Sequence, residues 1–393
     1  MKTVLLVLSR DYENSPSSGR KTIISNYLDG LSKCYQVKTI VIQSFFNQSS
    51  VKEGGSLAYR VLKNIIERRY PFQSLLYLSR SEIDRLNRCF REVEPDYVLI
   101  DGVRLVPAVT CSDIIQESNV ILDIDDVLSY RYEGYLYNSY GIQFGIFGRK
   151  FSFLKKVIPY RFQQRFLEFE ISKLKELEMV SYQTFQKIVF SSITEMNSVI
   201  NGLDRKYISD NKFYSQVFPY VSKKSALTTK TLTFGFLGSD KAVQNKETIK
   251  YLTNLWTKYN VKYKLILAGD IDKCNYKNND NITYSGYLPS LDSFYDSIDL
   301  VIAPSFVKGG VKTKVIESFC NEVAVIGNET SFEGVPISAN YPGKLSEEEL
   351  IDLLTSKLEV VSNKYDSLMP YCNEVSQYSS KINHSMLIKK VFS

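Results

Sequence analysis

Short runs of apolar residues alternate with longer amphipathic stretches through the first half of the chain. The mainly apolar runs cover residues 3–8, 37–42, 96–100, 120–124 and 187–190, and the run at 3–8 is continuous. A continuous apolar run of this length is typical of a strand that is covered on both faces, as in a parallel sheet. The stretches 20–33 and 81–93 have the periodicity of helices. This alternation predicts a doubly wound, parallel α/β sheet.

The same alternation starts again after Pro219. The later apolar runs cover residues 232–236, 264–268, 282–285, 300–303 and 324–327. Because the second series opens with its own Gly-ended run, we favour two Rossmann-like domains facing each other across a cleft over one elaborated α/β domain. We expect an N-terminal domain over residues 1–215 and a C-terminal domain over 216–375. A last helix, 376–393, is expected to cross back to the first domain.

Composition places the chain among ordinary globular proteins. The chain has 393 residues, of which 44% are hydrophobic and 23% charged, which excludes wholesale disorder. A net charge of +6 is too modest to indicate nucleic-acid binding, although it suits polyphosphate ligands or an anionic surface. Six widely spaced cysteines indicate reduced thiols in a reducing compartment, with no zinc site. With neither a signal peptide nor a membrane-spanning run, we expect a soluble, cytoplasmic protein.

Candidate chemistry lies in the loops that follow the strands of the second half, because ligands of open parallel sheets bind at the carboxyl ends of the strands. Gly238-Ser239 follows the first of these strands, Gly269 the second and Gly286-Tyr287-Leu288 the third. After the fourth strand, Gly309-Gly310 lets the backbone approach a ligand closely just before a helix begins.

Positive charge gathers at this fourth loop. Lys308, Lys312 and Lys314 lie beside the expected helix N-terminus, which suits a diphosphate. Glu317, about one turn further on, is placed to accept hydrogen bonds from a pair of ribose hydroxyls. A Gly-ended loop followed by a helix with a solvated lysine face would explain the same residues.

From Gly286 to Pro336 the chain resembles the nucleotide-binding half of the GT-B glycosyltransferases, in particular the retaining family four (glycosyl transferases group 1). The segments that carry the resemblance are Gly286–Leu288, Asp299–Ser305, Gly309–Glu317 and Ala324–Gly334. The start of the second half, Gly235–Gly238 followed by Asn245, is also similar.

The resemblance implies roles for these residues. In the family, the residue matching Glu317 holds the donor ribose, the Gly-rich loop and its lysine cradle the diphosphate, and the loop matching 286–288 lies against the base. With the strand-end loops, this predicts a donor site of Gly238, Ser239, Asn245, Lys246, Gly269, Tyr287, Leu288, Gly309, Gly310, Val311, Lys312, Thr313, Lys314 and Glu317. Many members carry another Glu eight positions before the one matching Glu317, where this chain has Gly309, so the identity of the sugar does not carry over.

The chain has a single histidine, His384, which argues against histidine-based catalysis. A retaining transferase of the family needs no strong base, because the departing phosphate oxygen takes the acceptor's proton. The protein then has to position two substrates and stabilise a charged leaving group. We therefore predict a metal-independent reaction with no cofactor, using a UDP- or GDP-linked sugar as donor.

A cluster of carboxylates ends the fourth strand of the first half. Asp125 and Asp126 follow this strand and are predicted, with Lys314 and Glu317, to be catalytic. Helix capping is the alternative for the two aspartates. The resemblance is looser here, but it places the acceptor near Ser18, Gly19 and Arg20.

Residues 148–165 are basic and aromatic without any acidic residue. Such a stretch suits peripheral contact with an anionic membrane, at the inner face of the cell membrane; a helix packing its apolar side on the core is the alternative. The sequence thus predicts a glycosyltransferase that transfers a sugar from a nucleotide sugar to a saccharide or lipid-linked acceptor in bacterial surface polysaccharide or glycolipid assembly. The rival hypotheses are a catalytically silent homologue acting as a binding subunit and a sugar-nucleotide epimerase.

Overall fold

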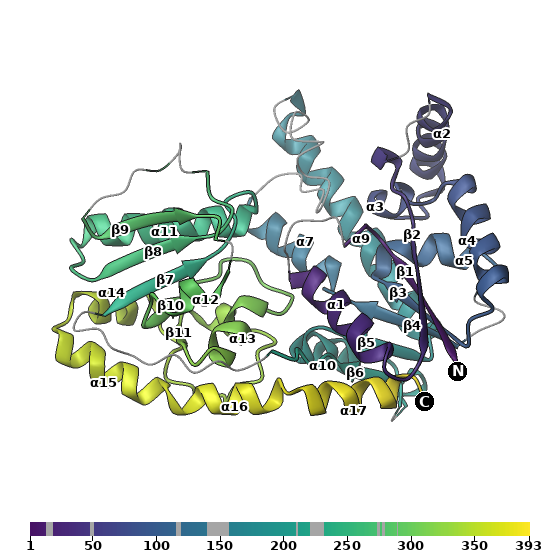
Figure 1. Cartoon of the computed structure of the whole chain (residues 1–393). Coiled ribbons are helices and arrows are strands. Elements are labelled where there is room, and N and C mark those ends of the chain that lie inside the picture. Colours follow the sequence, from purple (N-terminus) through teal and green to yellow (C-terminus); the bar gives the residue numbers. More distant parts are fainter. Residues whose placement is uncertain are drawn as a thin grey trace. The chain divides into compact units, whose positions relative to one another are not determined.

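A computed structural model of the chain forms two compact units. It describes residues 1–12, 19–47, 51–114, 119–139, 157–209, 211–220, 232–272, 276, 280–288 and 290–393. Unit 1 contains Met1–Gln216 together with the chain end, Ser385–Ser393, and unit 2 contains Val217–His384 (Figure 1). No helix in the described part of the chain combines the length and the hydropathy that a bilayer crossing requires.

Unit 1 is built on a six-stranded sheet in which every described pairing is parallel, with the strand order β2-β1-β3-β4-β5-β6. Its strands are β1 (Thr3–Leu8), β2 (Gln36–Val41), β3 (Tyr97–Asp101), β4 (Asn119–Ile124), β5 (Lys187–Phe190) and β6 (Phe213–Ser215). Residues Val4–Leu8 are at most 5% exposed, as expected of a strand covered on both faces.

The helices of unit 1 connect these strands. They are α1 (Gly19–Leu31), α2 (Val51–Glu67), α3 (Phe72–Leu75), α4 (Arg80–Val93), α5 (Val106–Thr110), α7 (Leu128–Tyr137), α9 (Tyr160–Thr184) and α10 (Ile193–Gly202), with the short 3₁₀ helices η1 (Phe45–Asn47), η2 (Val103–Leu105) and η4 (Arg205–Tyr207). Helix α10 begins at a capped end, since the Ser192 hydroxyl accepts the amide N–H of Glu195.

Unit 2 is built on a five-stranded parallel sheet with the order β11-β10-β7-β8-β9. The strands are β7 (Thr233–Leu237), β8 (Lys264–Ala268), β9 (Ile282–Gly286), β10 (Leu300–Ile302) and β11 (Ala324–Ile326). The helices are α11 (Val243–Lys258), α12 (Asp292–Tyr295), α13 (Thr313–Cys320), α14 (Glu347–Thr355), α15 (Leu358–Leu368) and α16 (Pro370–Tyr378), with η6 (Glu329–Phe332). Helix α17 (Lys381–Val391) begins in unit 2 and ends in unit 1.

The predicted strands are all present, and none of their ends differs from the prediction by more than one residue. The sequence analysis missed β6, whose three residues are half-buried and form no apolar run. It also missed the long helix α9. The stretch 148–165, interpreted as a basic surface, includes only the start of this helix, from Tyr160. The first nine residues of that stretch, 148–156, lie outside the described residues.

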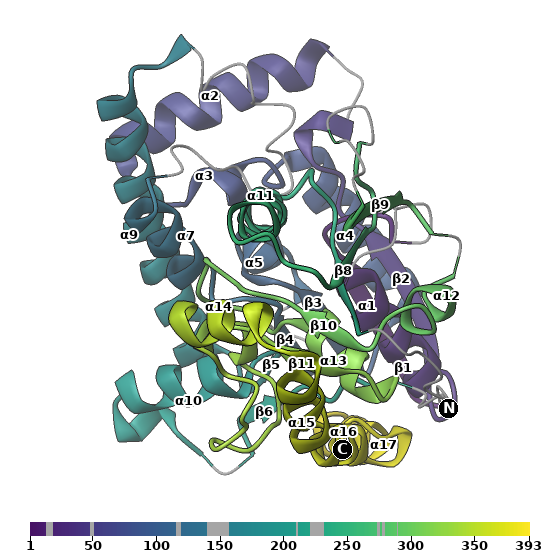
Figure 2. The ribbon, with the colours of Figure 1, turned by 90° about the vertical axis from the view of Figure 1, so that its left-hand side faces the viewer.

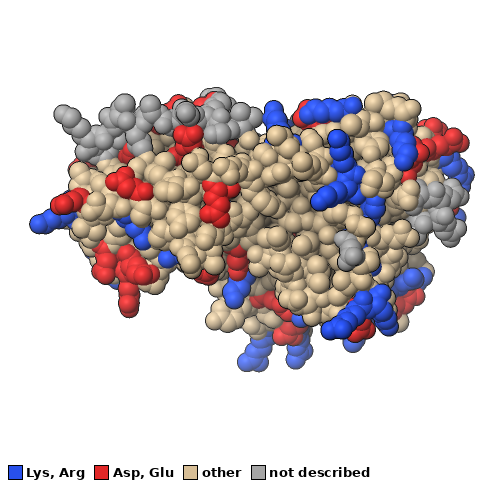
Figure 3. Space-filling view, turned by 90° about the horizontal axis from the view of Figure 1, so that it is seen from below, with Lys and Arg blue, Asp and Glu red and all other residues tan. Residues whose placement is uncertain are grey.

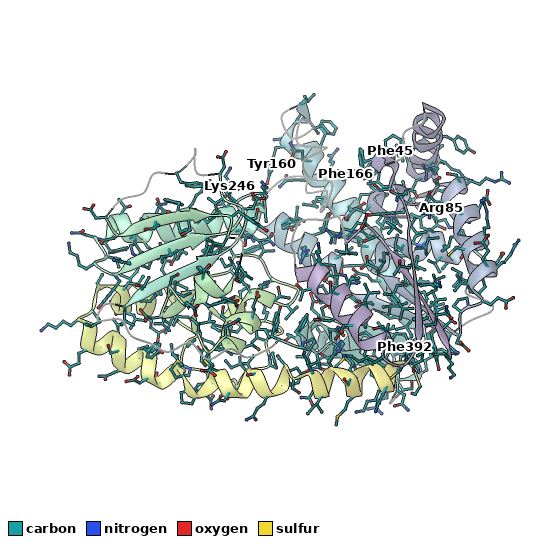
Figure 4. All side chains as sticks on the ribbon, in the orientation of Figure 1. Phe45, Arg85, Tyr160, Phe166, Lys246 and Phe392 are labelled. Atoms are coloured by element: carbon teal, nitrogen blue, oxygen red, sulfur yellow. The ribbon has the colours of Figure 1, made fainter. Side chains whose placement is uncertain are left out.

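The end of the chain is anchored in unit 1 by aromatic contacts. The ring of Phe392, labelled in Figure 4, lies 5.9 Å from that of Tyr35 and 5.7 Å from that of Tyr97. The Tyr35 hydroxyl donates to the Phe392 carbonyl at 2.7 Å, and Lys187 Nζ donates to the Val391 carbonyl at 2.8 Å. Because Phe392 is only 1% exposed, these contacts make it a core residue of unit 1.

We expect Phe392→Ala to lower the free energy of unfolding of unit 1 by about 3–5 kcal/mol, because it empties a buried aromatic position. Met386→Ala is the matched control, since Met386 lies on α17, which ends one residue before Phe392, and is 55% exposed. Urea unfolding followed by circular dichroism measures both variants. Equal stability of the two would show that the chain end contributes little to unit 1.

Candidate functional site

The loops that follow β7, β8 and β9 lie against each other at the carboxyl edge of the second sheet. The Gly238 N–H donates to the Ala268 carbonyl, and the Gly269 N–H donates to the Gly286 carbonyl, each at 2.9 Å. A Cβ on Gly269 would collide with the Gly238 carbonyl, and Gly269 has a φ of +125°, which a side chain disfavours. The strand ends predicted to bind a ligand are therefore neighbours in the structure.

Lys314 reaches this edge from α13. Its ammonium donates to Asn245 Oδ1 at 3.0 Å and to the Leu237 carbonyl at 3.3 Å, and it lies 4.2 Å from the ring centre of Phe236. Burial, and then the nearby charge of Lys312, lowers the pKa of Lys314 to about 7. No carboxylate balances the ammonium among these contacts, so an anion bound at this edge would favour its charged form.

Glu317 lies three residues after Lys314 and therefore on the same side of α13. Its side chain is half-buried, and burial raises its pKa to about 7. Within the described part of the chain, the hydrogen bonds that Glu317 accepts from Asn321 go to its backbone carbonyl, and no hydrogen bond or ion pair reaches its carboxyl group. A half-buried carboxyl group that receives no donor from the protein is suited to accept hydroxyl groups from a ligand.

The Gly-rich loop before α13 has the backbone conformation that its sequence indicated. Gly309 has a φ of +89° and Gly310 a φ of +66°, both in the left-handed region. Lys312 Nζ donates to the carbonyls of Gly309 at 2.7 Å and Val307 at 3.3 Å. Because its ammonium is bonded to this loop, Lys312 holds the shape of the loop in addition to supplying positive charge.

The remaining residues of the predicted donor site surround this edge. Lys246 is exposed in the first turn of α11 and is labelled in Figure 4. Tyr287 is 71% exposed just after β9, so its ring is open to a planar partner. The other predicted members are half-buried residues of the same loops and of the first position of α13: Ser239, Leu288, Val311 and Thr313. Lys241, in the loop after β7, forms an ion pair with Asp270.

A buried ion network occupies the carboxyl edge of the first sheet. Arg20 Nη2 lies 2.5 Å from Asp101 Oδ1 and 2.8 Å from Asp123 Oδ2. The Ser9 hydroxyl and the Tyr12 hydroxyl both donate to Asp101 Oδ2. Burial alone would raise the pKa of Asp101, but Arg20 and Ser9 hold it well below its usual range. Asp123 has fewer donors, and burial raises its pKa to about 6.

This network changes the interpretation of Arg20. Predicted to contact the acceptor, Arg20 is only 4% exposed, and its guanidinium joins the ends of β3 and β4. The structure therefore favours a positioning role for Arg20 at the strand ends. Gly19 is the first residue of α1, and Ser18 lies outside the described residues.

The two aspartates predicted to be catalytic have different surroundings. Asp126 is 6% exposed and pairs with Arg131 at 2.5 Å. Asp125 has a side chain that is 34% exposed, and its Oδ1 lies 3.8 Å from Arg20 Nη1. Neither caps α7, whose N-cap is Val127 without a side-chain hydrogen bond. Of the pair, Asp125 is the one whose carboxylate remains accessible to a substrate.

Sequence reasoning missed Asp101 and Glu333, which the structure connects to the predicted residues. Asp101 is the last residue of an apolar strand, as Asp123 is the next-to-last residue of β4, and this signal was available in the sequence. Glu333 Oε2 accepts the N–H of Gly309 at 2.9 Å, although the two residues are 24 positions apart in the sequence, and no local sequence pattern predicts that contact. The described residues contain no group of three His, Cys, Asp or Glu arranged to hold a metal ion.

Residues 231–346, most of unit 2, match the family model of the group 1 glycosyl transferases. No curated protein matches the sequence significantly. The matched segment contains every predicted donor-site residue, and the match confirms the resemblance inferred from residues 286–336.

Solved structures of glycosyltransferases share the whole fold. Sucrose-phosphate synthase from Thermosynechococcus elongatus superposes with a TM-score of 0.66 at 10% identity, over 100% of this chain and 98% of that one. HepE from Anabaena in complex with UDP-glucose gives 0.64 at 9% identity over 99% of both chains. WaaG, a glycosyltransferase involved in lipopolysaccharide biosynthesis, gives 0.54 at 10% identity, over 99% of this chain and 98% of that one. These similarities confirm the predicted two-domain α/β fold.

The lowered pKa of Lys314 is directly measurable. We expect the ¹³C-dimethyl resonance of Lys314, after reductive methylation, to titrate with a midpoint near pH 7, so that its amine is charged below this pH and neutral above it. An ordinary surface lysine titrates near about 10.4. The resonance is assigned by its absence in Lys314→Met. A midpoint near that of surface lysines would contradict the burial of this ammonium.

Proposed function

We propose that this chain, a glycosyltransferase with the GT-B fold, transfers a sugar from a nucleotide sugar to a saccharide or lipid-linked acceptor during bacterial surface polysaccharide or glycolipid assembly. The observation that carries the proposal is that a cation and a carboxyl group, Lys314 and Glu317, lie on the same side of α13 without forming an ion pair with each other. The HepE structures contain UDP and UDP-glucose, and WaaG acts in lipopolysaccharide biosynthesis, which supports this class of donor and this pathway.

The donor site fits the parts of a nucleoside diphosphate. Lys314 faces the diphosphate, together with the amide groups of the Gly-rich loop and the first turn of α13. Glu317 accepts the ribose hydroxyls, whose donation compensates the desolvation of its carboxylate. Tyr287, exposed after β9, lies against the base. We propose a UDP- or GDP-linked donor, because both offer the same ribose and diphosphate to these residues.

The proposed reaction retains the configuration of the sugar and needs no metal. As the diphosphate leaves, its negative charge increases, and Lys314 and the backbone amides stabilise this charge without reorganising. The leaving phosphate oxygen takes the acceptor's proton. Asp125, whose carboxylate is accessible in unit 1, is proposed to orient an acceptor hydroxyl, while Arg20 holds the strand ends behind it.

A catalytically silent homologue is the main rival, because Gly309 stands where many family members carry a glutamate. The two hypotheses differ in what the second unit binds. An active transferase binds its nucleotide tightly and releases it from the sugar donor, whereas a silent subunit does neither.

We expect one of UDP, GDP, CMP and dTDP to bind clearly more tightly than the others, and Glu317→Ala to weaken that binding by about ten- to a hundred-fold, since hydrogen bonds to a charged group are lost. Isothermal calorimetry measures both proteins. Glu348→Ala, an exposed position on α14, is the control. If none of the four nucleotides binds at millimolar concentration, the active-transferase proposal fails.

Membrane contact is the second part of the proposal. Four large apolar side chains on α2 are exposed, namely Tyr59 (65%), Leu62 (63%), Ile65 (62%) and Ile66 (83%). Near the start of α9, Tyr160 and Phe162 are also exposed, at 45% and 61%. Figures 1 and 2 show α2 and the start of α9 at the same end of unit 1.

Exposed cations accompany this apolar surface, at Lys63, Arg68, Arg69, Arg161 and Arg165. The acidic residue Glu67 is also exposed among these cations and lies 3.7 Å from Lys63; on the face of the molecule seen from below, basic and acidic side chains both occur (Figure 3). Apolar side chains flanked by cations are typical of elements that lie in the interface of an anionic bilayer. We propose that α2 extends the contact predicted for residues 148–165, and that the protein works peripherally at the inner face of the cell membrane.

The double variant Leu62→Asp/Ile66→Asp tests this surface. We expect it to reduce binding to phosphatidylglycerol vesicles by about ten-fold or more, because two apolar insertions are lost. The control is Val360→Asp, which replaces an apolar residue that is 51% exposed on α15. Vesicle co-sedimentation is the measurement. Equal binding by both variants, or equal binding of the wild type to neutral phosphatidylcholine vesicles, would contradict this part of the proposal.

A further inference from the structure

The loops after β10 and β11 are joined into one rigid piece. These strands are parallel neighbours, so their carboxyl ends lie at the same edge of the second sheet. Asn328 donates to the Ser305 carbonyl at 2.8 Å and accepts the Ser305 N–H at 3.0 Å. The Ser331 hydroxyl donates to the same Asn328 oxygen at 2.7 Å. The loop after β11 is therefore hydrogen-bonded directly to Ser305, which lies on the loop that leads to Gly309.

Glu333 uses this fixed geometry to reach Gly309. It follows η6 directly, and its Oε2 accepts the Gly309 N–H at 2.9 Å. The opposite side of the same glycine is held by Lys312, whose ammonium donates to the Gly309 carbonyl at 2.7 Å. A carboxylate and an ammonium thus bind the two polar groups of one left-handed glycine and define the shape of the loop.

The Glu333 carboxylate retains hydrogen-bonding capacity. A carboxylate offers about four lone-pair sites to donors. Among the described residues, the Gly309 N–H is the single donor to this half-buried group. Its Oε1 is therefore able to accept a hydrogen bond from a ligand bound against the Gly-rich loop.

We propose that Glu333 is a specificity-determining residue that accepts hydroxyl groups of the transferred sugar. This inference rests on the proposed function, because it assumes a nucleotide sugar at the edge of unit 2. A carboxylate repels the diphosphate, so it cannot serve that part of the donor. Glu317 is assigned to the ribose hydroxyls. The transferred sugar is the remaining part of the donor that is rich in hydroxyl donors, and Glu333 is held beside the loop that approaches it.

The test compares binding of a nucleotide with binding of the same nucleotide carrying a sugar. The probes are UDP with UDP-glucose and GDP with GDP-mannose, measured by calorimetry on the full chain. Glu333→Gln keeps an oxygen that can accept the Gly309 N–H, so it preserves the loop while removing the charge. Glu329→Gln is the control, because Glu329 begins the same η6 turn and its side chain is 77% exposed.

We expect Glu333→Gln to leave the Kd of the preferred nucleotide within about two-fold of wild type and to weaken the nucleotide sugar about ten-fold. Glu333→Ala should weaken both ligands, since the loop loses its support, and the control should change neither. If Glu333→Gln weakens both ligands equally, or neither, the sugar contact is wrong while the proposed function stands. If the wild type binds none of the four ligands, the proposed function and this inference fail together.

Discussion

A lysine ammonium at the edge of a parallel sheet is the constraint on which the rest of unit 2 depends. Lys314 crosses from α13 to the end of β7 and to Asn245 of α11, so it ties three elements at the point where their loops converge. This position is costly for a cation, and the lowered pKa of Lys314 expresses that cost. A bound diphosphate would offset it, which couples the local stability of this edge to occupancy of the donor site.

Unit 1 also has a buried cation at the carboxyl edge of its sheet, but there the charge is balanced within the protein. There the cation, Arg20, is already neutralised by Asp101 and Asp123, and this buried network holds the ends of β1, β3 and β4 as a rigid platform. Because desolvation offsets much of the Coulomb attraction in a buried ion pair, this network is better evidence for how the three strand ends are held than for added stability. The proposed acceptor side is therefore preorganised, whereas the donor side keeps an unbalanced charge for its ligand.

Much of this arrangement could be predicted from the sequence, because strands and tight loops are encoded by residues that are neighbours in the chain. Strands covered on both faces appear as continuous apolar runs, and the Gly309-Gly310 pair announces a left-handed loop before a helix. The contacts that were missed all depend on register. Pairing of Asp101 opposite Asp123 follows from how β3 and β4 align, and Glu333 meets Gly309 because β11 lies beside β10. No periodicity within a single segment encodes such neighbours.

The aromatic anchor at Phe392 has a consequence for how the chain is made. Tyr97 receives Lys2 at its hydroxyl and Phe392 against its ring, so the two ends of the chain meet on one side chain of unit 1. Unit 2 is a continuous segment, Val217–His384, which lies in the sequence between the two segments of unit 1. Ser385–Ser393 are therefore synthesised after the whole of unit 2, so the contacts of Phe392 with Tyr35 and Tyr97 form only once the second unit has been made.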